Sequence, residues 1–304
     1  MNVFDLRRAV QVILGEMEEA IAAVLKEMGV PTGATTLYEF VEVIYPIVEK
    51  ARREIFAEQT LLMGWEIAEH GLELKPAPLR EYFPAATYKT LASALNIGSD
   101  KRSYLYTMDY LDDVSRELAG EKILVTDDNR FDPEVMEEGL KRISAAVERH
   151  ARDAGRQAVI DTKNHGIVRE SRNEVQPDDY RGSADSGGVV LGWARILVGE
   201  SNCSMCAMLA SRGPVYDEDT VLVAGRGTRE GQRYHENCDC EAVLVIKGRK
   251  WEGEKEYKRL KKIWDSSRDN PTDEEVEQGL EYPIDRFTKR WREADQKSFA
   301  PQLA

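Results

Sequence analysis

The four cysteines of this 304-residue sequence lie close together in its C-terminal half and are its most informative feature. They form a Cys-x-x-Cys pair, Cys203 and Cys206, and a Cys-x-Cys pair, Cys238 and Cys240, with His235 just before the second pair. Zinc in proteins takes four thiolate or imidazole ligands in a tetrahedron, and two ligands separated by two residues can reach one ion from a tight turn. The spacing therefore predicts a structural zinc site.

Five candidate ligands compete for four places. We expect Cys203, Cys206 and Cys238 to bind the ion together with either His235 or Cys240. Cys240 is the less favoured of these two, because a Cys-x-Cys pair reaches one ion with a tighter geometry than Cys-x-x-Cys. The second interpretation of the cluster is that the cysteines form a disulfide or remain as buried free thiols, since cysteine is among the most buried residue types. A redox-active Cys-x-x-Cys is the third, although no strand clearly leads into the motif.

The sequence offers no catalytic set, and we expect no enzymatic activity. A zinc deaminase requires His-x-Glu ahead of Pro-Cys-x-x-Cys, and both the order and the spacing differ here. Of the other histidines, His70 and His165 lie at expected helix ends, and His150 is expected on a helix surface. The glycine-rich segment 225–231 lacks the Lys-Ser/Thr ending of a phosphate-binding loop, so we interpret it as a hairpin or loop.

The formal net charge of −13 and the pI near 5.0 disfavour binding to nucleic acid, except where positive charge is concentrated locally. One such stretch is found between Lys247 and Lys262. Three acidic residues dilute it, and Tyr257, Leu260 and Trp264 follow the spacing of the apolar stripe of a helix. We interpret it as the solvated face of a helix. The alternative is a nucleic-acid contact surface.

The elements that position these residues are mostly helical in the first half of the chain. Apolar residues at helical spacing predict a helix over 4–28, a stop at 29–33 and a second helix over about 36–69 that Pro46 kinks or splits. The sequence then predicts a helix over 88–95, a polar loop over 96–103, a helix over 104–118, a strand over 123–125, a turn over 126–129 and a helix from Pro133 to about 163.

The second half changes in character, and the fold class is expected to be α+β. The domains are predicted as a helical domain over 1–165, a linker or long loop over 166–188, a mixed Cys/His subdomain over 189–246 and a helical tail over 247–304. The last helix is expected near 273–295. The longest apolar stretch, 189–198, contains Arg195 and is too short to span a bilayer, so we expect no membrane association.

The cysteine region resembles the MuF-like minor head proteins of phages, most closely those of actinobacteriophages. The likeness rests on Trp193–Arg195, on Cys203–Tyr216 (CSMCAMLASRGPVY) and on Tyr234–Cys240 (YHENCDC), and it covers about 189–245. That family has a Cys-x-x-Cys with a Leu-Ala-Ser-Arg-Gly turn, followed by a His-x-x-Cys-x-Cys block. Order, spacing and flanking residues all match. The N-terminal helices carry no motif of their own.

The resemblance implies a structural role in the phage head. Such proteins enter the prohead with or near the portal and assist head assembly or DNA ejection. The expected partners are the portal protein and the major capsid or scaffolding protein, with nucleic acid possible but not favoured. The expected location is the virion, inside the capsid, and the host cytoplasm during assembly. The alternative is a zinc-stabilised nucleic-acid-binding protein that uses the Lys247–Lys262 face.

Overall fold

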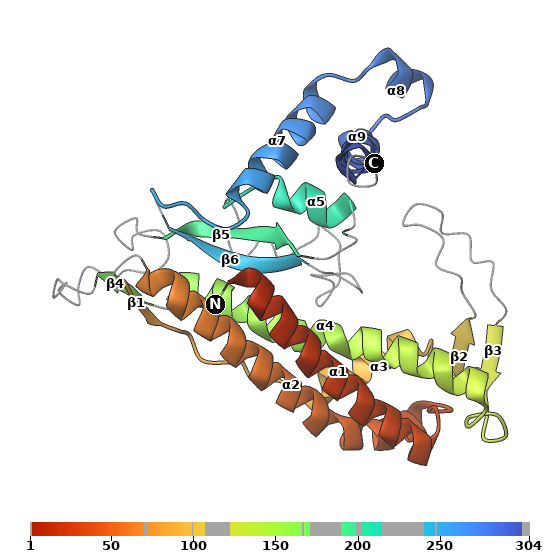
Figure 1. Ribbon diagram of the computed structural model, residues 1–304. Coiled ribbons are helices and arrows are strands. Elements are labelled where there is room, and N and C mark those ends of the chain that lie inside the picture. Colours follow the sequence, from red (N-terminus) through yellow and green to blue (C-terminus); the bar gives the residue numbers. More distant parts are fainter. Residues whose placement is uncertain are drawn as a thin grey trace. The chain divides into compact units, whose positions relative to one another are not determined.

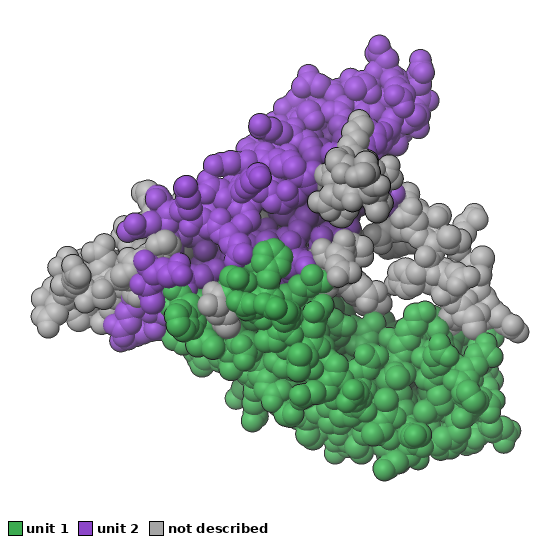
Figure 2. Space-filling view, in the orientation of Figure 1, with its two compact units in different colours: residues 1–65, 76–158, 234–237 green, residues 66–75, 159–233, 238–304 purple. Residues whose placement is uncertain are grey.

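A computed structural model describes most of the chain (Figure 1). The described residues are 2–69, 72–98, 100–106, 122–165, 167–170, 190–198, 202, 204–214, 240–246 and 248–299. They are mostly helical, with a few short strands paired in two-stranded antiparallel sheets, which agrees with the predicted α+β class and its helical ends. The chain divides into two compact units, coloured separately in Figure 2, and each is described by itself.

The first unit begins with a long helix, α1 (Val3–Met28), which confirms the helix predicted over 4–28. A capping box fixes its start: the Asn2 side chain accepts hydrogen bonds from the backbone of Phe4 and Asp5, and the Asp5 carboxylate accepts one from the backbone of Asn2. The helix ends where Gly29 takes a positive φ of 68°.

The second helix, α2 (Ala34–Ala68), confirms the second prediction but continues through Pro46 without being split. Proline in a helix interior removes one backbone hydrogen bond and costs about 3 kcal/mol. Apolar side chains on both sides of Pro46, including Ile44 and Val48, are fully buried, and this burial holds the helix together across the proline. Residues 70 and 71, expected to end this helix, lie outside the described residues.

Helix α3 (Pro84–Ala94) begins earlier than the predicted 88–95, because Pro84 occupies the first turn, where its fixed φ suits a helix. Strand β3 (Lys122–Val125) confirms the strand predicted over 123–125. Its antiparallel partner is β2 (Ser103–Tyr106), so the helix predicted over 104–118 is wrong at its start. Tyr104, Leu105 and Tyr106 favour a strand once β3 offers a partner. The remainder of that prediction falls on residues 107–118, outside the described part of the chain.

Helix α4 (Pro133–His165) confirms the helix predicted from Pro133 to about 163. In the first unit it packs closely on α2, since a Cβ placed on Gly155 would lie 3.0 Å from Ile55 Cγ2. Helix α4 also buries several alanines, among them Ala151, Ala154 and Ala158. Short side chains therefore allow the two long helices to approach each other.

His150 of α4 is largely enclosed in the first unit, so its expected place on a helix surface is wrong. Its ring lies 5.4 Å from that of Tyr82, and its Nε2 shares a hydrogen bond of 2.7 Å with Thr90 Oγ1. Arg52 donates to the His150 backbone oxygen at 2.7 Å and lies over the Tyr82 ring. Burial, and then the nearby Arg149 and Arg52 charges, lower the pKa of His150 to about 4.

The free energy of unfolding is expected to depend on pH through His150. An unfolded histidine has a pKa of about 6.5, and the folded value is about 4. The unfolded state therefore binds a proton that the folded state excludes, and the stability present above pH 6.5 is lost as pH falls to 4. We expect a loss on the order of 2–3 kcal/mol over this window.

Urea unfolding between pH 7 and 4, with hydrogen exchange followed in α4 peptides, checks this expectation. The His150→Gln variant provides the control and should show a shallower slope. The comparison is needed because burial raises the pKa of Glu66, in the second unit, to about 7, which produces a slope of opposite sign. Equal slopes in the two proteins would contradict the assignment to His150.

The second unit contains two small sheets. Strand β1 (Leu72–Lys75) pairs antiparallel with β4 (Ile167–Glu170), with Leu72 opposite Glu170. The first residues of the expected linker over 166–188 thus form a strand, whereas residues 171–188 lie outside the described part. Strand β5 (Val190–Leu197) pairs antiparallel with β6 (Cys240–Ile246), with a β-bulge between Val190 and Gly192. The short helix α5 (Ser204–Ala210) lies between them in sequence.

The described C-terminal part of the second unit, residues 248–299, is mostly helical, which agrees with the predicted helical end of the chain. It contains α7 (Glu254–Asp269), α8 (Asp273–Glu277) and α9 (Pro283–Phe299). The single helix expected near 273–295 is interrupted at 278–282, where Gly279 has a positive φ of 71° and Pro283 begins the next helix. In the described residues, none of the helices combines the length and the apolar composition required to cross a membrane.

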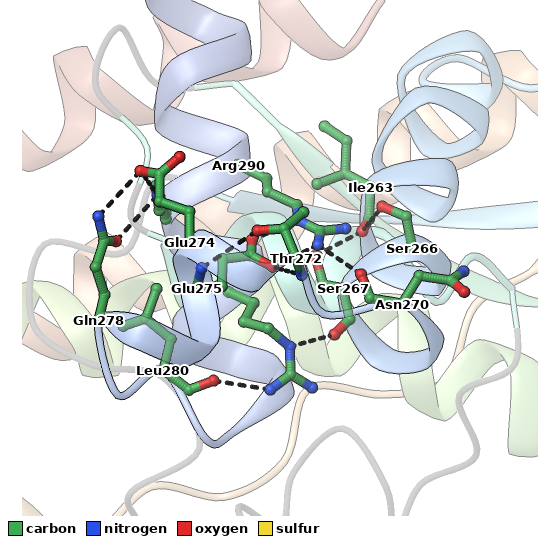
Figure 3. Close-up of polar contacts among 12 residues, drawn as sticks. Ile263, Ser266, Ser267, Asn270, Thr272, Glu274, Glu275, Gln278, Leu280 and Arg290 are labelled. Carbon is green, nitrogen blue, oxygen red and sulfur yellow. Dashed lines mark hydrogen bonds and ion pairs between the residues drawn. The ribbon is translucent and has the colours of Figure 1, made fainter.

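Arginines of α9 fasten α8 to the end of α7 (Figure 3). Arg290 binds the Glu275 carboxylate through two hydrogen bonds of 2.6 and 2.5 Å. Glu275 also closes a capping box with Thr272 at the start of α8. Arg286 donates to the backbone oxygens of Ser267, Leu280 and Glu281. Since these guanidinium groups satisfy carbonyls at a helix end and in a turn, the turn between α7 and α9 has a fixed path.

Candidate functional site

The structure describes two of the five predicted metal ligands, and both belong to the second unit. Cys206 lies in the middle of α5, and Cys240 is the first residue of β6. Both side chains are buried. Cys203, His235 and Cys238 lie outside the described residues. Within the described part of the chain, no group of three or more possible metal ligands is found.

The β5–β6 sheet is buried on both faces in its described part, and it is largely apolar apart from the charged Arg195 and Glu241. Consecutive residues from Gly192 to Ile196 on β5, and every residue of β6, are buried. Because side chains alternate between the two faces of a strand, such a run means that both faces are covered. This arrangement explains the long apolar stretch over 189–198, of which residues 190–197 form strand β5.

Helix α5 covers one face of this sheet. Its Ala207 and Ala210 join Leu260 of α7 with Phe287 and Trp291 of α9 in a buried apolar cluster, and Leu197 of β5 packs against it. Leu197 is also the Cα partner of Cys240 in the ladder. Cys240 therefore lies at the end of the sheet that faces α5, the helix that contains Cys206. In Figure 1, α5 is seen between the β5–β6 sheet and the C-terminal helices.

A buried arginine contacts the Cys240 sulfur. Arg195 Nη1 donates a hydrogen bond of 3.2 Å to Cys240 Sγ, and Arg195 is only 3% exposed. Arg195, Leu197 and Cys240 lie on one face of the sheet, because residues two apart on a strand share a face, as do Cα partners across the ladder. This contact was not predicted from the sequence. The signal for it was a single charged residue inside an otherwise apolar strand.

The turn after α5 is tightly packed on both sides. Gly213 has a positive φ of 66°, and a Cβ placed there would lie 2.5 Å from Tyr257 Cε2. A Cβ placed on Gly192 of β5 would lie 2.3 Å from the Pro214 backbone oxygen. The two glycines thus allow the chain leaving α5 to pass between β5 and the Tyr257 ring of α7.

Replacing Gly213 by alanine is expected to destabilise the second unit more than the same change at Gly248. Both glycines have a positive φ, which costs an alanine roughly 1–2 kcal/mol. Gly248 has open space where the Cβ would be, whereas Gly213 faces the Tyr257 ring, and overpacking adds about 1–3 kcal/mol. Thermal unfolding of the two single variants measures the difference. An equal loss of stability in Gly213→Ala and Gly248→Ala would mean that the Tyr257 ring moves aside at no cost.

The basic residues between 247 and 262 lie largely on α7, and several form ion pairs within that helix. Lys258 contacts Glu254, Arg259 contacts Glu256 through two hydrogen bonds, and Lys261 contacts Asp265. The predicted apolar stripe is confirmed, since Leu260 is fully buried and Trp264 packs against Phe287. The lysines named here are exposed. This is the arrangement expected of the outer face of an amphipathic helix.

Comparison with known proteins connects this chain to phages. The family model described as VG15 protein matches residues 98–267, more than half of the chain, and the match includes β5, α5, β6 and most of α7. The chain is 28% identical over 147 residues to the Gene 15 protein of Mycobacterium phage D29, covering 41% of this chain and 47% of that protein. It is also 28% identical over 115 residues to the Gene 15 protein of Mycobacterium phage L5, covering 28% of this chain and 39% of that protein.

This chain spans less than half the length of the two curated relatives. No solved structure matches it. The family match covers both described cysteines and the arginine that contacts one of them. The relatives come from mycobacteriophages, which supports a phage protein of the actinobacteriophage type. The chain belongs to the VG15 protein family.

Proposed function

We propose that this chain is a non-enzymatic minor head protein of the MuF-like kind, which acts inside the phage head through contacts with the portal, capsid or scaffolding protein. The observation that carries the proposal is the family match over 98–267, which contains the motif-bearing segment that resembles the MuF-like proteins. The mycobacteriophage relatives agree with the actinobacteriophage origin that the motif indicates. As a phage structural or morphogenesis protein, it has no need of a catalytic set.

A structural zinc ion is part of this proposal, with ligands drawn from Cys203, Cys206, His235, Cys238 and Cys240. The described residues fit such a site. Two thiols are buried, Cys206 on α5 and Cys240 at the start of β6, and the Arg195 guanidinium next to Cys240 can balance the negative charge of metal-bound thiolates. Cys203 precedes Cys206 by three residues, and Cys238 precedes Cys240 by two. The ion would supply a cross-link between α5 and the start of β6.

The charge distribution supports contacts with protein rather than with nucleic acid. The chain carries a net charge of −13, and the cations of α7 described above are balanced within their own helix. An acidic protein next to packaged DNA is repelled by its phosphates, which leaves it able to move with or away from the DNA. In the alternative function, nucleic-acid binding, the basic face of α7 would be the contact surface.

The test is whether the protein is part of the head. Proheads and virions purified from a phage that encodes a tagged copy should contain the protein in a few copies per particle, and it should co-purify with the portal protein. Quantitative mass spectrometry of the gradient-purified particles measures this. Absence of the protein from both particles would contradict the proposal.

A charge-reversal variant distinguishes the alternative. Lys255, Lys258 and Lys262 are exposed on α7, and changing all three to glutamate should leave the head association unchanged. If the wild-type protein instead binds DNA with a steep dependence on salt concentration, and the variant does not, the chain is a nucleic-acid-binding protein.

A further inference from the structure

We propose that residues 273–282 form the surface through which this chain docks on a partner protein, and that they fit an apolar depression with a basic rim. We call these residues the α8 tip, since they comprise α8 and the turn that follows it. The proposal rests on the proposed function and deepens it, because it names the contact surface and the chemistry of the partner. In Figure 1, the α8 tip lies beyond the end of α7 that is farther from the β5–β6 sheet.

Two large apolar side chains of the α8 tip are exposed to solvent. Val276 is 65% exposed and Tyr282 is 66% exposed, and these are the highest values among the large hydrophobic side chains of the described residues. Apolar side chains scattered singly over a surface are common, whereas a concentration of them marks interaction sites. Tyrosine is also one of the residue types that contribute most to the binding energy at protein interfaces. The exposed side chains of the α8 tip are therefore suited to a protein contact.

The α8 tip is held in place by α9 rather than by a packed core of its own. Glu275 is buried and Leu280 is partly buried, whereas the other residues of the tip are exposed. Arg286 donates to the backbone oxygens of Leu280 and Glu281, and Arg290 binds the Glu275 carboxylate (Figure 3). These bonds fix the backbone before a partner arrives. Binding would not have to order this segment, which favours a tight complex.

The charges of the α8 tip indicate the chemistry of the partner. The tip contains five carboxylates and no cation. Two of them, Glu274 and Glu275, are paired with Lys289 and Arg290 of α9. The other three are exposed and form no ion pair within the described part of the chain: Asp273, Glu277 and Glu281. Carboxylates around exposed apolar side chains are complementary to an apolar depression whose rim carries lysine or arginine.

The same charges disfavour the other classes of occupant. Nucleic acid and the surfaces of anionic membranes are negatively charged and repel exposed carboxylates. A second copy of this chain would bring another net charge of −13, and the α7 cations described above are paired within their own helix. The occupant that fits is therefore a different protein, with basic groups around an apolar site.

The number of copies in purified phage particles tests this surface. A phage that encodes the full-length chain with Val276→Ser/Tyr282→Ser should carry at least about tenfold fewer copies per particle than the wild type, because a few apolar and aromatic anchors dominate binding at interfaces. The Glu277→Gln/Glu281→Gln variant should lower the copy number by about two- to fivefold, since charges at a rim contribute less. Both variants should unfold at the wild-type temperature, because the changed side chains are exposed.

The matched control is Val12→Ser/Phe83→Ser in the first unit, where the two side chains are 62% and 60% exposed. Phe83 and Tyr282 each directly precede the proline that begins a helix, so the two serines occupy equivalent positions. The control should keep the wild-type copy number. A wild-type copy number in Val276→Ser/Tyr282→Ser, or an equal loss in the control, would overturn the inference and leave the proposed function intact. Absence of the wild-type chain from the particles would instead contradict the proposed function.

A photo-cross-linker at position 282 identifies the occupant without relying on the serine variants. With p-benzoylphenylalanine in place of Tyr282, irradiated particles should yield a cross-link to a peptide of another head protein that contains lysine or arginine beside apolar residues. The same group in place of Phe83 should not produce this cross-link. A cross-link from position 282 to DNA or to a second copy of the chain, or no cross-link at all, would overturn the inference.

Discussion

Replacing Trp193 by alanine is expected to lower the free energy of unfolding of the second unit by about 3–5 kcal/mol. Trp193 lies in the middle of β5, opposite Leu244 of β6, and its side chain is fully buried. Removing the Trp193 side chain leaves a cavity, because the described residues of the sheet are covered on both faces. The neighbouring side chains are closely packed and cannot move to fill this space. The substitution therefore destabilises the β5–β6 strand pair, which contains Arg195 and Cys240.

Hydrogen exchange of β5 and β6 peptides, with urea unfolding followed by circular dichroism, measures this effect. Trp65→Ala provides the matched control, because the Trp65 side chain is 54% exposed on α2 in the first unit. The control should cost well under 1 kcal/mol, as is usual for exposed positions. Similar losses in the two variants would mean that the β5–β6 sheet is not a packed core.

Glu275→Gln is expected to destabilise the C-terminal helices by roughly 3–5 kcal/mol, because it leaves the Arg290 guanidinium without its anion. Only 3% of the Glu275 side chain and 18% of the Arg290 side chain are exposed. The hydrogen bonds from Arg290, with that from the Thr272 backbone, lower the pKa of Glu275 to about 2 against its burial. The Glu275–Arg290 ion pair is therefore a main stabilising interaction between α8 and α9.

The sign of the pH dependence follows from this lowered pKa. The stabilisation is complete above pH 4.5, the unfolded value, and is lost as pH falls through about 2. Thermal unfolding between pH 5 and 2 should show this loss in the wild type and not in Glu275→Gln. Glu274→Gln is the matched control, since Glu274 pairs with Lys289 but is 69% exposed, and it should cost less than about 1 kcal/mol. If both variants behave alike, the buried pair contributes no more than a surface pair.

Local patterns in the sequence were sufficient to predict the long helices. The helices over 3–28, 34–68 and 133–165 each follow an apolar repeat. A capping box marks the start of the first, and Pro133 marks the start of the third. The apolar stripe of α7 was predictable for the same reason. In each case the information lies within a few turns of one helix, so neighbouring residues are enough.

Pairings between distant segments were not predictable from such patterns. Strands β1 and β4 have four residues each, and their partners are separated by nearly a hundred residues. His150 has charged neighbours in sequence, Glu148 and Arg149, which indicate a surface position, but Tyr82 and Thr90 come from another part of the chain and enclose it. The Arg195–Cys240 contact also depends on strand register, which the sequence alone does not fix.

The most direct test of the central claim, that the cysteine region of this phage protein is a structural metal centre, is the zinc content of the full-length chain purified from a reducing cytosol. Native mass spectrometry, compared with elemental analysis, gives the ratio of zinc to protein for the wild type and for the Cys206→Ser/Cys240→Ser double variant. We predict about one zinc per wild-type chain and none in the double variant. A wild-type chain that carries no zinc, with its four thiols unbound or joined in disulfides, would contradict the account.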